Sequence, residues 1–246
     1  MAVHDYNAQR LYLDAPLTPG ARIATSREQA NYLLNVLRLG PGDRLLAFNG
    51  RDGEWMVEIE LEGKKAVALA PREQIRPQTP PGRITYLFAP LKRARLDYMV
   101  QKAVEMGVAR LCPVMTRRTV AERVNLERMR ANAIEAAEQC GILSLPAIDE
   151  PATLTQALAR LDASLPLVFC DEAAEVANPV AALAGVPRGE VGVLVGPEGG
   201  FDPAERAAIL ARPGAVPISL GPRIMRADTA AVAALAVINA TLGDWG

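Results

Sequence analysis

The sequence predicts an α/β protein in two parts, a small β-barrel followed by a larger domain whose parallel sheet is covered by helices. Three observations predict this arrangement. Residues 77–82 hold three prolines and one glycine, which is the composition of a linker. Before them, apolar and polar residues alternate as in half-buried antiparallel strands. After them, strand-like and helix-like patterns alternate, which is typical of a parallel sheet.

The first part, residues 1–76, is expected to contain a short antiparallel sheet. Its clearest strand is 54–62, because every second side chain there is apolar. Neighbouring strands are expected at 45–48 and 66–69, across turn-rich segments. The apolar face of the central strand, which should be buried, consists of Trp55, Val57, Ile59 and Leu61.

One helix is expected in this part, over residues 26–38. Ser26 has the position of an N-cap, and Gln29 completes a capping box with it. Gly40 followed by Pro41 should end the helix, because proline cannot continue it. The first part therefore reads as a small β-barrel with one helix.

The second part, residues 83–246, is expected to alternate between strands and helices. Its clearest helix start has Asp202 as N-cap, Pro203 at the first helical position and Glu205 at the third. Strands are expected at residues 84–91, 108–115, 165–170, 191–195 and 216–220. Further helices are expected at residues 96–106, 125–139, 153–161 and 179–184, and from an N-cap at Asp228 to about residue 242. Ligands of such sheets bind at the carboxyl ends of the strands.

Several classes of protein are excluded by what the sequence lacks. It has no run of about 18 apolar residues, so no membrane span is expected, and its start has no signal-peptide pattern. His4 is the only histidine, which argues against a Ser-His-Asp triad and a His-rich zinc site. Cys112, Cys140 and Cys170 form no CxxC pair. We expect reduced thiols in a cytoplasmic protein without a metal site.

The small net charge of −1 hides a strong asymmetry along the chain. Residues 83–130 hold 11 basic and 4 acidic residues, whereas residues 131–205 hold 2 basic and 12 acidic ones. The basic block suggests an anionic partner such as nucleic acid. A solvated helix face would explain the same block equally well.

Two glycine corners follow the last two predicted strands, at residues 196–200 and 221–222. Neither has the spacing of a dinucleotide fingerprint or of a P-loop. Near the first corner, Glu198, Asp202 and Glu205 would repel a polyphosphate. Backbone groups beside an acidic wall suit a neutral base joined to a cation, so S-adenosylmethionine (SAM) fits. Two tight turns without a ligand fit as well.

The two corners, GPEGGF at 196–201 and LGPRIMRADTA at 220–230, resemble the paired signature of the SPOUT methyltransferase superfamily. Among its members, the chain is most similar to RsmE-type 16S ribosomal RNA uridine-N3 methyltransferases. Further segments match that family in the same order, namely NVLR with GD within residues 35–43, APLK at 89–92, QKAVEMGV at 101–108 and EAAEQCG at 135–141.

The resemblance implies a PUA-like RNA-binding barrel at 1–76, a linker at 77–82 and a SPOUT domain with a deep trefoil knot at 83–246. It also implies a homodimer that uses SAM to methylate N3 of a uridine in 16S ribosomal RNA of the small subunit. By the same resemblance, the knot loops bind the cofactor through Gly196, Glu198, Gly199, Gly200, Leu220, Gly221, Ile224 and Met225.

The chemistry points to residues after the second corner. N3 of uridine must lose a proton before it can accept a methyl group, so a base or a cation beside O2 and O4 is required. Arg226 and Arg223 are the candidate stabilisers, and Asp228 is the candidate base. Structural alternatives stay open, because Arg226 could bond helix carbonyls and Asp228 could simply cap the last helix.

The chain departs from the family pattern at two places. Ile142 stands where the family commonly has an arginine, which puts one RNA contact in doubt. Ala227, Asp228 and Thr229 stand where the family commonly has Thr-Glu-Thr, which shortens the reach of the carboxylate.

Residues expected at the RNA are mostly basic. They are Arg38, Lys92, Arg93, Arg95, Lys102, Arg117 and Arg118, and Glu138 and Gln139 are expected either at the pocket or in helix-end packing. Other functions compatible with the glycine corners or the basic block are a SPOUT enzyme acting on ribose 2′-OH or transfer RNA, and a non-catalytic RNA-binding protein.

Overall fold

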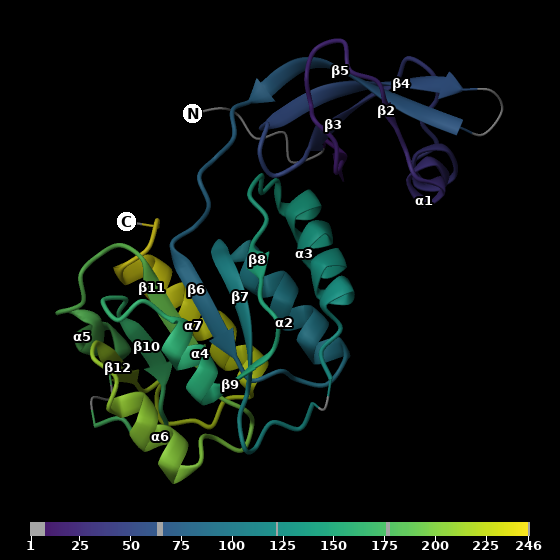
Figure 1. Cartoon of the computed structure of the whole chain (residues 1–246). Helices are drawn as coiled ribbons and strands as arrows, with labels where there is room; N and C mark the ends of the chain where they lie inside the picture. Colours follow the sequence, from purple (N-terminus) through teal and green to yellow (C-terminus); the bar gives the residue numbers. More distant parts are fainter. Residues whose placement is uncertain (1–7, 63–65, 122, 176–177, 246) are drawn as a thin grey trace. The chain divides into compact units, whose positions relative to one another are not determined.

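The computed structural model describes residues 8–62, 66–121, 123–175 and 178–245 (Figure 1). His4 lies outside the described residues. The chain divides into two compact units, the first comprising Met1–Pro80 with Ala137–Ser144 and the second Pro81–Ala136 with Leu145–Gly246. Residues 137–144, which we expected in the second domain, thus belong to the first unit.

The first unit contains a five-stranded sheet in the order β1-β3-β4-β5-β2. β1 pairs parallel with β3, and the other pairs are antiparallel. The strands are β1 (Arg10–Tyr12), β2 (Ile23–Ala24), β3 (Arg44–Phe48), β4 (Glu54–Glu62) and β5 (Ala66–Arg76). The sequence predicted β3, β4 and the first four residues of β5, whose pairing with β4 continues to Arg76. β1 and β2 are too short to show a period.

Alternation along β4 determines the core of this unit. Trp55, Val57 and Ile59 are buried, as their common face predicts. Leu61 differs, because 41% of its surface is exposed, so the prediction that all four are buried is wrong for this residue.

The predicted helix of the first unit is confirmed at its start and modified at its end. The Ser26 hydroxyl accepts from Gln29 N and the Gln29 side chain accepts from Ser26 N, which is the expected capping box. α1 (Arg27–Asn31) continues as one π-helical turn, η1 (Tyr32–Val36). The left-handed residue that follows is Arg38, with φ of 58°, and not Gly40.

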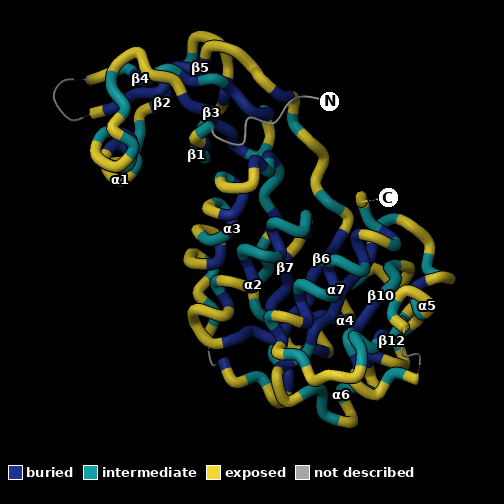
Figure 2. The backbone as a smooth tube through the Cα atoms, turned by 180° about the vertical axis from the view of Figure 1, so that it is seen from behind, coloured by how far each residue is buried: buried dark blue, intermediate teal, exposed yellow. Residues whose placement is uncertain are grey.

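The second unit is built on a sheet whose strand pairs are all parallel. The order is β12-β10-β11-β6-β7-β8, and β9 also pairs with β7. Figure 2 shows its strands as mostly buried backbone. The strands are β6 (Ile84–Phe88), β7 (Val108–Met115), β8 (Ala147–Ile148), β9 (Ala152–Thr153), β10 (Leu167–Cys170), β11 (Val191–Val195) and β12 (Ala215–Ile218).

This order places β10, β11 and β12 on the side of β6 away from β7. The chain runs from β6 outward to β7 and β8, then returns to the other side, where β11 lies between β6 and β10 and β12 takes the outer edge. Because all these strands are parallel, the loops that follow β6, β7, β10, β11 and β12 leave the sheet at one edge. That edge is where ligands of open α/β sheets bind.

Helices cover both faces of this sheet, with α4 in front of the strands and α7 behind them in Figure 1. α2 packs on α7, and α4 packs on α6. Asn125 caps α3, as its position predicted, whereas Thr153, expected as the first helical residue, is the N-cap of α4. The helices are α2 (Ala94–Glu105), α3 (Leu126–Cys140), α4 (Leu154–Arg160), α5 (Pro179–Leu183), α6 (Pro203–Leu210) and α7 (Ala227–Thr241). In the described ranges, none of the helices has the length and apolarity needed to cross a membrane.

Candidate cofactor and RNA site

The first glycine corner follows β11 and is a tight turn. Gly200 N donates to Pro197 O at 2.9 Å, and Gly200 has φ of 70°, which disfavours any residue with a side chain. A Cβ on Gly200 would lie 2.7 Å from Glu172 Oε1. A Cβ on Gly196 would lie 2.9 Å from the ring of Phe201, so the start of the turn also requires glycine.

The second corner follows β12 and borders open space. Gly221 has φ of 100°, and a Cβ built there would meet no atom of the described residues within 4 Å. Its amide donates to Ser219 Oγ at 3.3 Å. Leu220 and Met225 are half-buried, and Ile224 is fully exposed. A glycine of this conformation beside open space is a cradle that a ligand can approach closely, so the residues present fit a cofactor such as SAM.

The expected acidic wall at the first corner is only partly free. Asp202 caps α6 by accepting from Ala204 N at 2.9 Å, and Glu205 accepts from Asp202 N at 3.0 Å in a capping box. Glu198 forms an ion pair with Arg95. The three carboxylates are therefore held by helix-start amides or by an arginine, so little of the expected acidic wall is available to attract a cation.

Another carboxylate lies at this corner and was not predicted from the sequence. Glu172 follows β10, is exposed, and faces Gly200. Its neighbour Asp171 is buried and holds Arg206 through contacts of 2.8–3.1 Å. Only the order of the strands places the end of β10 beside β11, so no local pattern could have identified Glu172.

The candidate catalytic residues lie between β12 and α7. α7 begins at Ala227, and Arg226 is its N-cap, with an exposed side chain. Asp228 is therefore in the first turn of the helix, and the prediction that it is the N-cap is wrong. Arg223 is exposed on the second corner. Burial is the main cause that raises the pKa of Tyr86 on the neighbouring strand β6, and Asp228 adds to it.

The basic block at 83–130 is partly neutralised in the folded second unit. Three of its partners come from the acidic block at 131–205, so the two charge blocks meet in space. Within the described residues, its ion pairs are Arg95–Glu198, Lys102–Glu105, Arg110–Asp149, Arg117–Asp202 and Arg128–Asp97. The block is therefore not a uniformly free positive surface.

Among the residues expected at RNA, Lys92 and Arg93 are exposed in the loop after β6. Arg93 has φ of 38° and is the N-cap of α2. A non-glycine residue in this region is uncommon, and such strain is concentrated at functional sites. Lys102 instead contacts Glu105 at 2.7 Å and lies over the Tyr98 ring.

Three further residues expected at the RNA or the pocket lie in the first unit. Arg38 is exposed at the end of η1, and Gln139 is also exposed. The Glu138 carboxylate accepts from Tyr12 N at 2.8 Å, which is helix-end packing within this unit. Ile142 is half-buried near Gly141, whose carbonyl accepts from Arg76 at 2.9 Å.

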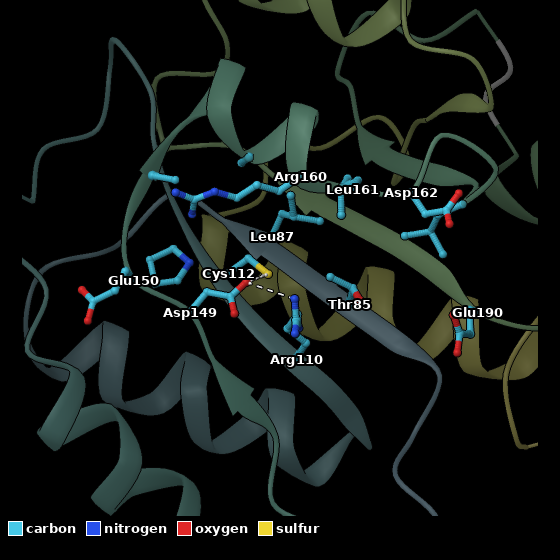
Figure 3. Close-up of a pocket in the computed structure, with 14 residues that line it drawn as sticks. Thr85, Leu87, Arg110, Cys112, Asp149, Glu150, Arg160, Leu161, Asp162 and Glu190 are labelled. Atoms are coloured by element: carbon cyan, nitrogen blue, oxygen red, sulfur yellow. Dashed lines mark hydrogen bonds and ion pairs between the residues drawn. The ribbon is translucent and has the colours of Figure 1, made fainter.

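A separate cavity of about 270 Å³ lies elsewhere in the second unit (Figure 3). Thr85, Arg110 and Glu190 line it near the amino ends of their strands. There the Cys112 thiol donates to Asp149 at 3.1 Å, and burial raises the pKa of Cys112 well above its usual value. Because residues of α4 also line it, the cavity lies over the face of the sheet that α4 covers, and it holds a neutral thiol. Over the residues that the structure describes, no group of three or more metal-ligating side chains is found.

Comparison with known proteins decides the family. An RNA methyltransferase domain matches residues 78–239, and the PUA domain of RNA methyltransferases matches residues 25–71. The chain belongs to the RNA methyltransferase family. This confirms the predicted family, the PUA-like nature of the first domain and the α/β class of the second.

Relatives and solved structures agree with this assignment. The ribosomal RNA small subunit methyltransferase E of Rickettsia conorii is 29% identical over 94% of both chains. The enzyme of the same name from Neisseria gonorrhoeae, solved bound to S-adenosyl methionine, has a TM-score of 0.86 at 26% identity and covers 98% of this chain and 100% of its own. A putative methyltransferase from Legionella pneumophila, solved with SAM, has a TM-score of 0.83 at 29% identity, covering 97% and 99%.

Proposed function

We propose that this RNA methyltransferase uses SAM to methylate N3 of a specific uridine in 16S ribosomal RNA of the small subunit. One observation carries the proposal. The two glycine corners meet the ligand-binding edge of the sheet, and Gly221 borders open space in a backbone conformation suited to close ligand approach. The similarity over almost the whole chain to ribosomal RNA small subunit methyltransferases E supports the substrate class.

The cofactor would be held mainly by backbone groups of the two corners. The residues proposed for this are Gly196, Glu198, Gly199, Gly200, Leu220, Gly221, Ile224 and Met225, in the arrangement of a knotted pocket. Glu172 adds an exposed carboxylate that faces the first corner. It is better placed to attract a sulfonium than Glu198, because Arg95 already neutralises Glu198.

When bound, SAM supplies the methyl group as an electrophile on its sulfonium. The chain must supply the other half of the chemistry, namely a nucleophilic N3. Arg226 and Arg223 are proposed to stabilise the negative charge that develops on O2 and O4 of the uridine. Asp228 is proposed to accept the N3 proton. Both arginines are exposed beside the second corner, so the uracil ring of the substrate can reach them without rearrangement of the fold.

RNA would be positioned by Arg38 in the first unit and by Lys92 and Arg93 in the second. All three side chains are exposed. Such contacts to phosphate set orientation and carry little sequence information. The methylation would take place in the cytoplasm, with small ribosomal subunits as the substrate.

A homodimer is also proposed, and its support comes from the resemblance. The sequence of α7 holds more apolar residues than one buried face needs, which would suit a dimer contact. Most of them, however, are buried inside the second unit, namely Ala231, Ala234, Leu235 and Ile238. Val232 is half-buried. Sedimentation at micromolar concentration tests the proposal, and a monomer that still methylates RNA would contradict it.

The decisive experiment measures binding and chemistry separately. Calorimetry with SAM in the presence of a chelator should show binding, since the proposal requires no metal. Mass spectrometry of 16S ribosomal RNA, incubated as naked RNA and as small subunits, should then show one new methyl group on N3 of a uridine. Methylation of a ribose 2′-OH or of transfer RNA would redirect the substrate assignment. A protein that binds RNA but not SAM would be a non-catalytic RNA-binding protein.

A further inference from the structure

Arg118 lies against the first glycine corner, although its place in the basic block suggested an RNA contact. Its Nη1 donates to Gly199 O at 2.6 Å. Its Cδ and Cβ lie 3.4 and 3.7 Å from the position that a Cβ on Gly199 would take. Both the charged end and the aliphatic stem of Arg118 therefore contact the same glycine, and all these atoms belong to the second unit.

Arg117, the preceding residue, makes a different kind of contact. Its backbone N–H donates to Glu205 Oε1 at 2.8 Å, which fixes the main chain of this loop to the start of α6. Its guanidinium is 72% exposed and lies 3.8 Å from Asp202. An exposed pair at this distance is weak. Two neighbouring arginines thus present one side chain to the glycine corner and the other to solvent.

We propose that Arg118 is a positioning residue for the cofactor loop, and that Arg117 alone of the two contacts RNA phosphate. This inference rests on the proposed function. By holding the Gly199 carbonyl, the Arg118 guanidinium fixes the peptide plane between Gly199 and Gly200. The amide of that peptide already closes the turn to Pro197. A loop held in this way loses less conformational freedom when a ligand binds.

The first experiment measures the stability of the loop in the absence of a ligand. Hydrogen exchange at the amides of residues 198–201 is compared in wild type, Arg118→Ala and Arg117→Ala. Exchange should be faster in Arg118→Ala, because the carbonyl of Gly199 loses its charged donor. It should be unchanged in Arg117→Ala, since the backbone contact of Arg117 to Glu205 is kept.

The second experiment measures the binding of SAM and of RNA. Arg118→Ala should weaken SAM binding about tenfold, as expected for loss of one hydrogen bond to a charged group, and leave the salt dependence of RNA binding as in wild type. Arg117→Ala should do the reverse and reduce the slope of log affinity against log salt by about 1. Arg118→Lys should restore part of the SAM affinity, because an ammonium can still donate to the carbonyl.

Gly199→Val is an independent way to remove the contact between Arg118 and the first glycine corner. Its Cβ would already contact the Arg118 stem, so we expect the two branches beyond it to crowd the stem and move the guanidinium. SAM affinity should fall in this variant, and adding Arg118→Ala should cause little further loss, because the two changes remove one interaction. Full additivity of the two losses would contradict the proposed contact.

The outcomes separate this inference from the proposed function. If Arg118→Ala leaves exchange at 198–201 and SAM affinity unchanged and lowers the RNA salt slope, Arg118 is a phosphate contact and the inference is overturned. If the wild-type protein does not bind SAM, the proposed function fails. The exchange comparison then still decides whether Arg118 holds the loop, and unchanged exchange overturns that as well.

Discussion

Two groups of arginines in this protein contact acidic residues, and burial separates their roles. In the first unit, Arg10 and Arg76 both donate to Glu54, and all three side chains are buried. Arg76 also donates to Gly141 O at 2.9 Å. At the ligand-binding edge of the second unit, Arg95 and Arg117 contact carboxylates but remain largely exposed.

The same residue types therefore stabilise the first unit where they are buried and are available for binding in the second unit where they are exposed. Burial alone would raise the pKa of Glu54, but hydrogen bonds from Arg76 and Arg10 outweigh it and hold that pKa below its usual value. Such a cluster cannot be opened without leaving a buried charge, so it fixes the unit. Exposed arginines can leave their partners at little cost and are free to bind RNA.

The largest expected effect is on stability. Glu54→Gln leaves two buried guanidinium groups without a carboxylate and should destabilise the protein by about 3 kcal/mol. The matched control is Glu60→Gln on the same strand, where Glu60 meets Arg22 and Arg72 at the surface and the change should cost less than about 1 kcal/mol. Urea unfolding of both variants measures this, and equal costs would remove the distinction between the two groups.

The same cluster predicts a pH dependence. Because the folded-state pKa of Glu54 is lowered, its contribution to stability is fully present above the unfolded-state value of 4.5 and is lost as pH falls through the folded-state value. The stability difference between wild type and Glu54→Gln should therefore shrink in acid. A difference that stays constant in urea unfolding down to the acid limit of folding would contradict this.

The next effect concerns chemistry at the exposed edge. Arg226→Ala should lower the single-turnover methylation rate roughly 100-fold, as for loss of one stabilising donor, with RNA and SAM both saturating. Arg188→Ala is the control, because Arg188 is also exposed but precedes β11 at the opposite end of that strand. A wild-type rate in Arg226→Ala would make Arg226 a structural residue.

A third test uses two glycines of similar conformation. Gly221 and Gly20 have φ of 100° and 81°, and neither Cβ position meets an atom of the described residues within 4 Å. Gly221→Val and Gly20→Val should therefore carry similar backbone strain, of order 1–2 kcal/mol. Only Gly221→Val should lose SAM binding in calorimetry, because its side chain enters the cofactor space. Equal SAM affinity in both variants would show that the second corner is only a turn.

The smallest expected effect is at Arg93. Arg93→Ala and Arg93→Gly should each reduce the RNA salt slope by about 1, because one phosphate contact is lost. Arg93→Gly should be the more stable of the two, by about 1 kcal/mol, since glycine tolerates φ of 38°. Salt titrations and thermal unfolding measure the two effects, and an unchanged slope would leave Arg93 with a structural role.

Local patterns predicted much of the fold, and their limits are clear. The capping boxes at Ser26 and Asp202 were predicted because each uses residues three positions apart. Strand β11 was predicted to the residue by its apolar run. The short strands β1, β2, β8 and β9 were missed, because two or three residues show no period. Asp228 was misread as a cap, since a residue in the first turn has the same composition signal as an N-cap.

The site was predicted in part for the same reason. The glycine corners could be predicted from the sequence, because the positive φ values at Gly200 and Gly221 favour glycine over other residues. The partners of the corners could not be read, since Glu172 and Arg118 reach the first corner from the ends of β10 and β7. The paired signature, and not periodicity, carried the expectation of a knot, which stays a prediction.

The sequence alone predicted the family, the order of the longer strands and the helices, and the two glycine turns, because each depends on residues close together in the chain. The partner of each charged side chain, in contrast, depended on the tertiary structure. Arg10, Glu54 and Arg76 became one buried cluster, Arg95 neutralised Glu198, and Arg118 turned to Gly199 while Arg117 faced solvent. These choices depend on distances between residues far apart in sequence, and the strand pairings of the two sheets, which set those distances, are absent from any local pattern.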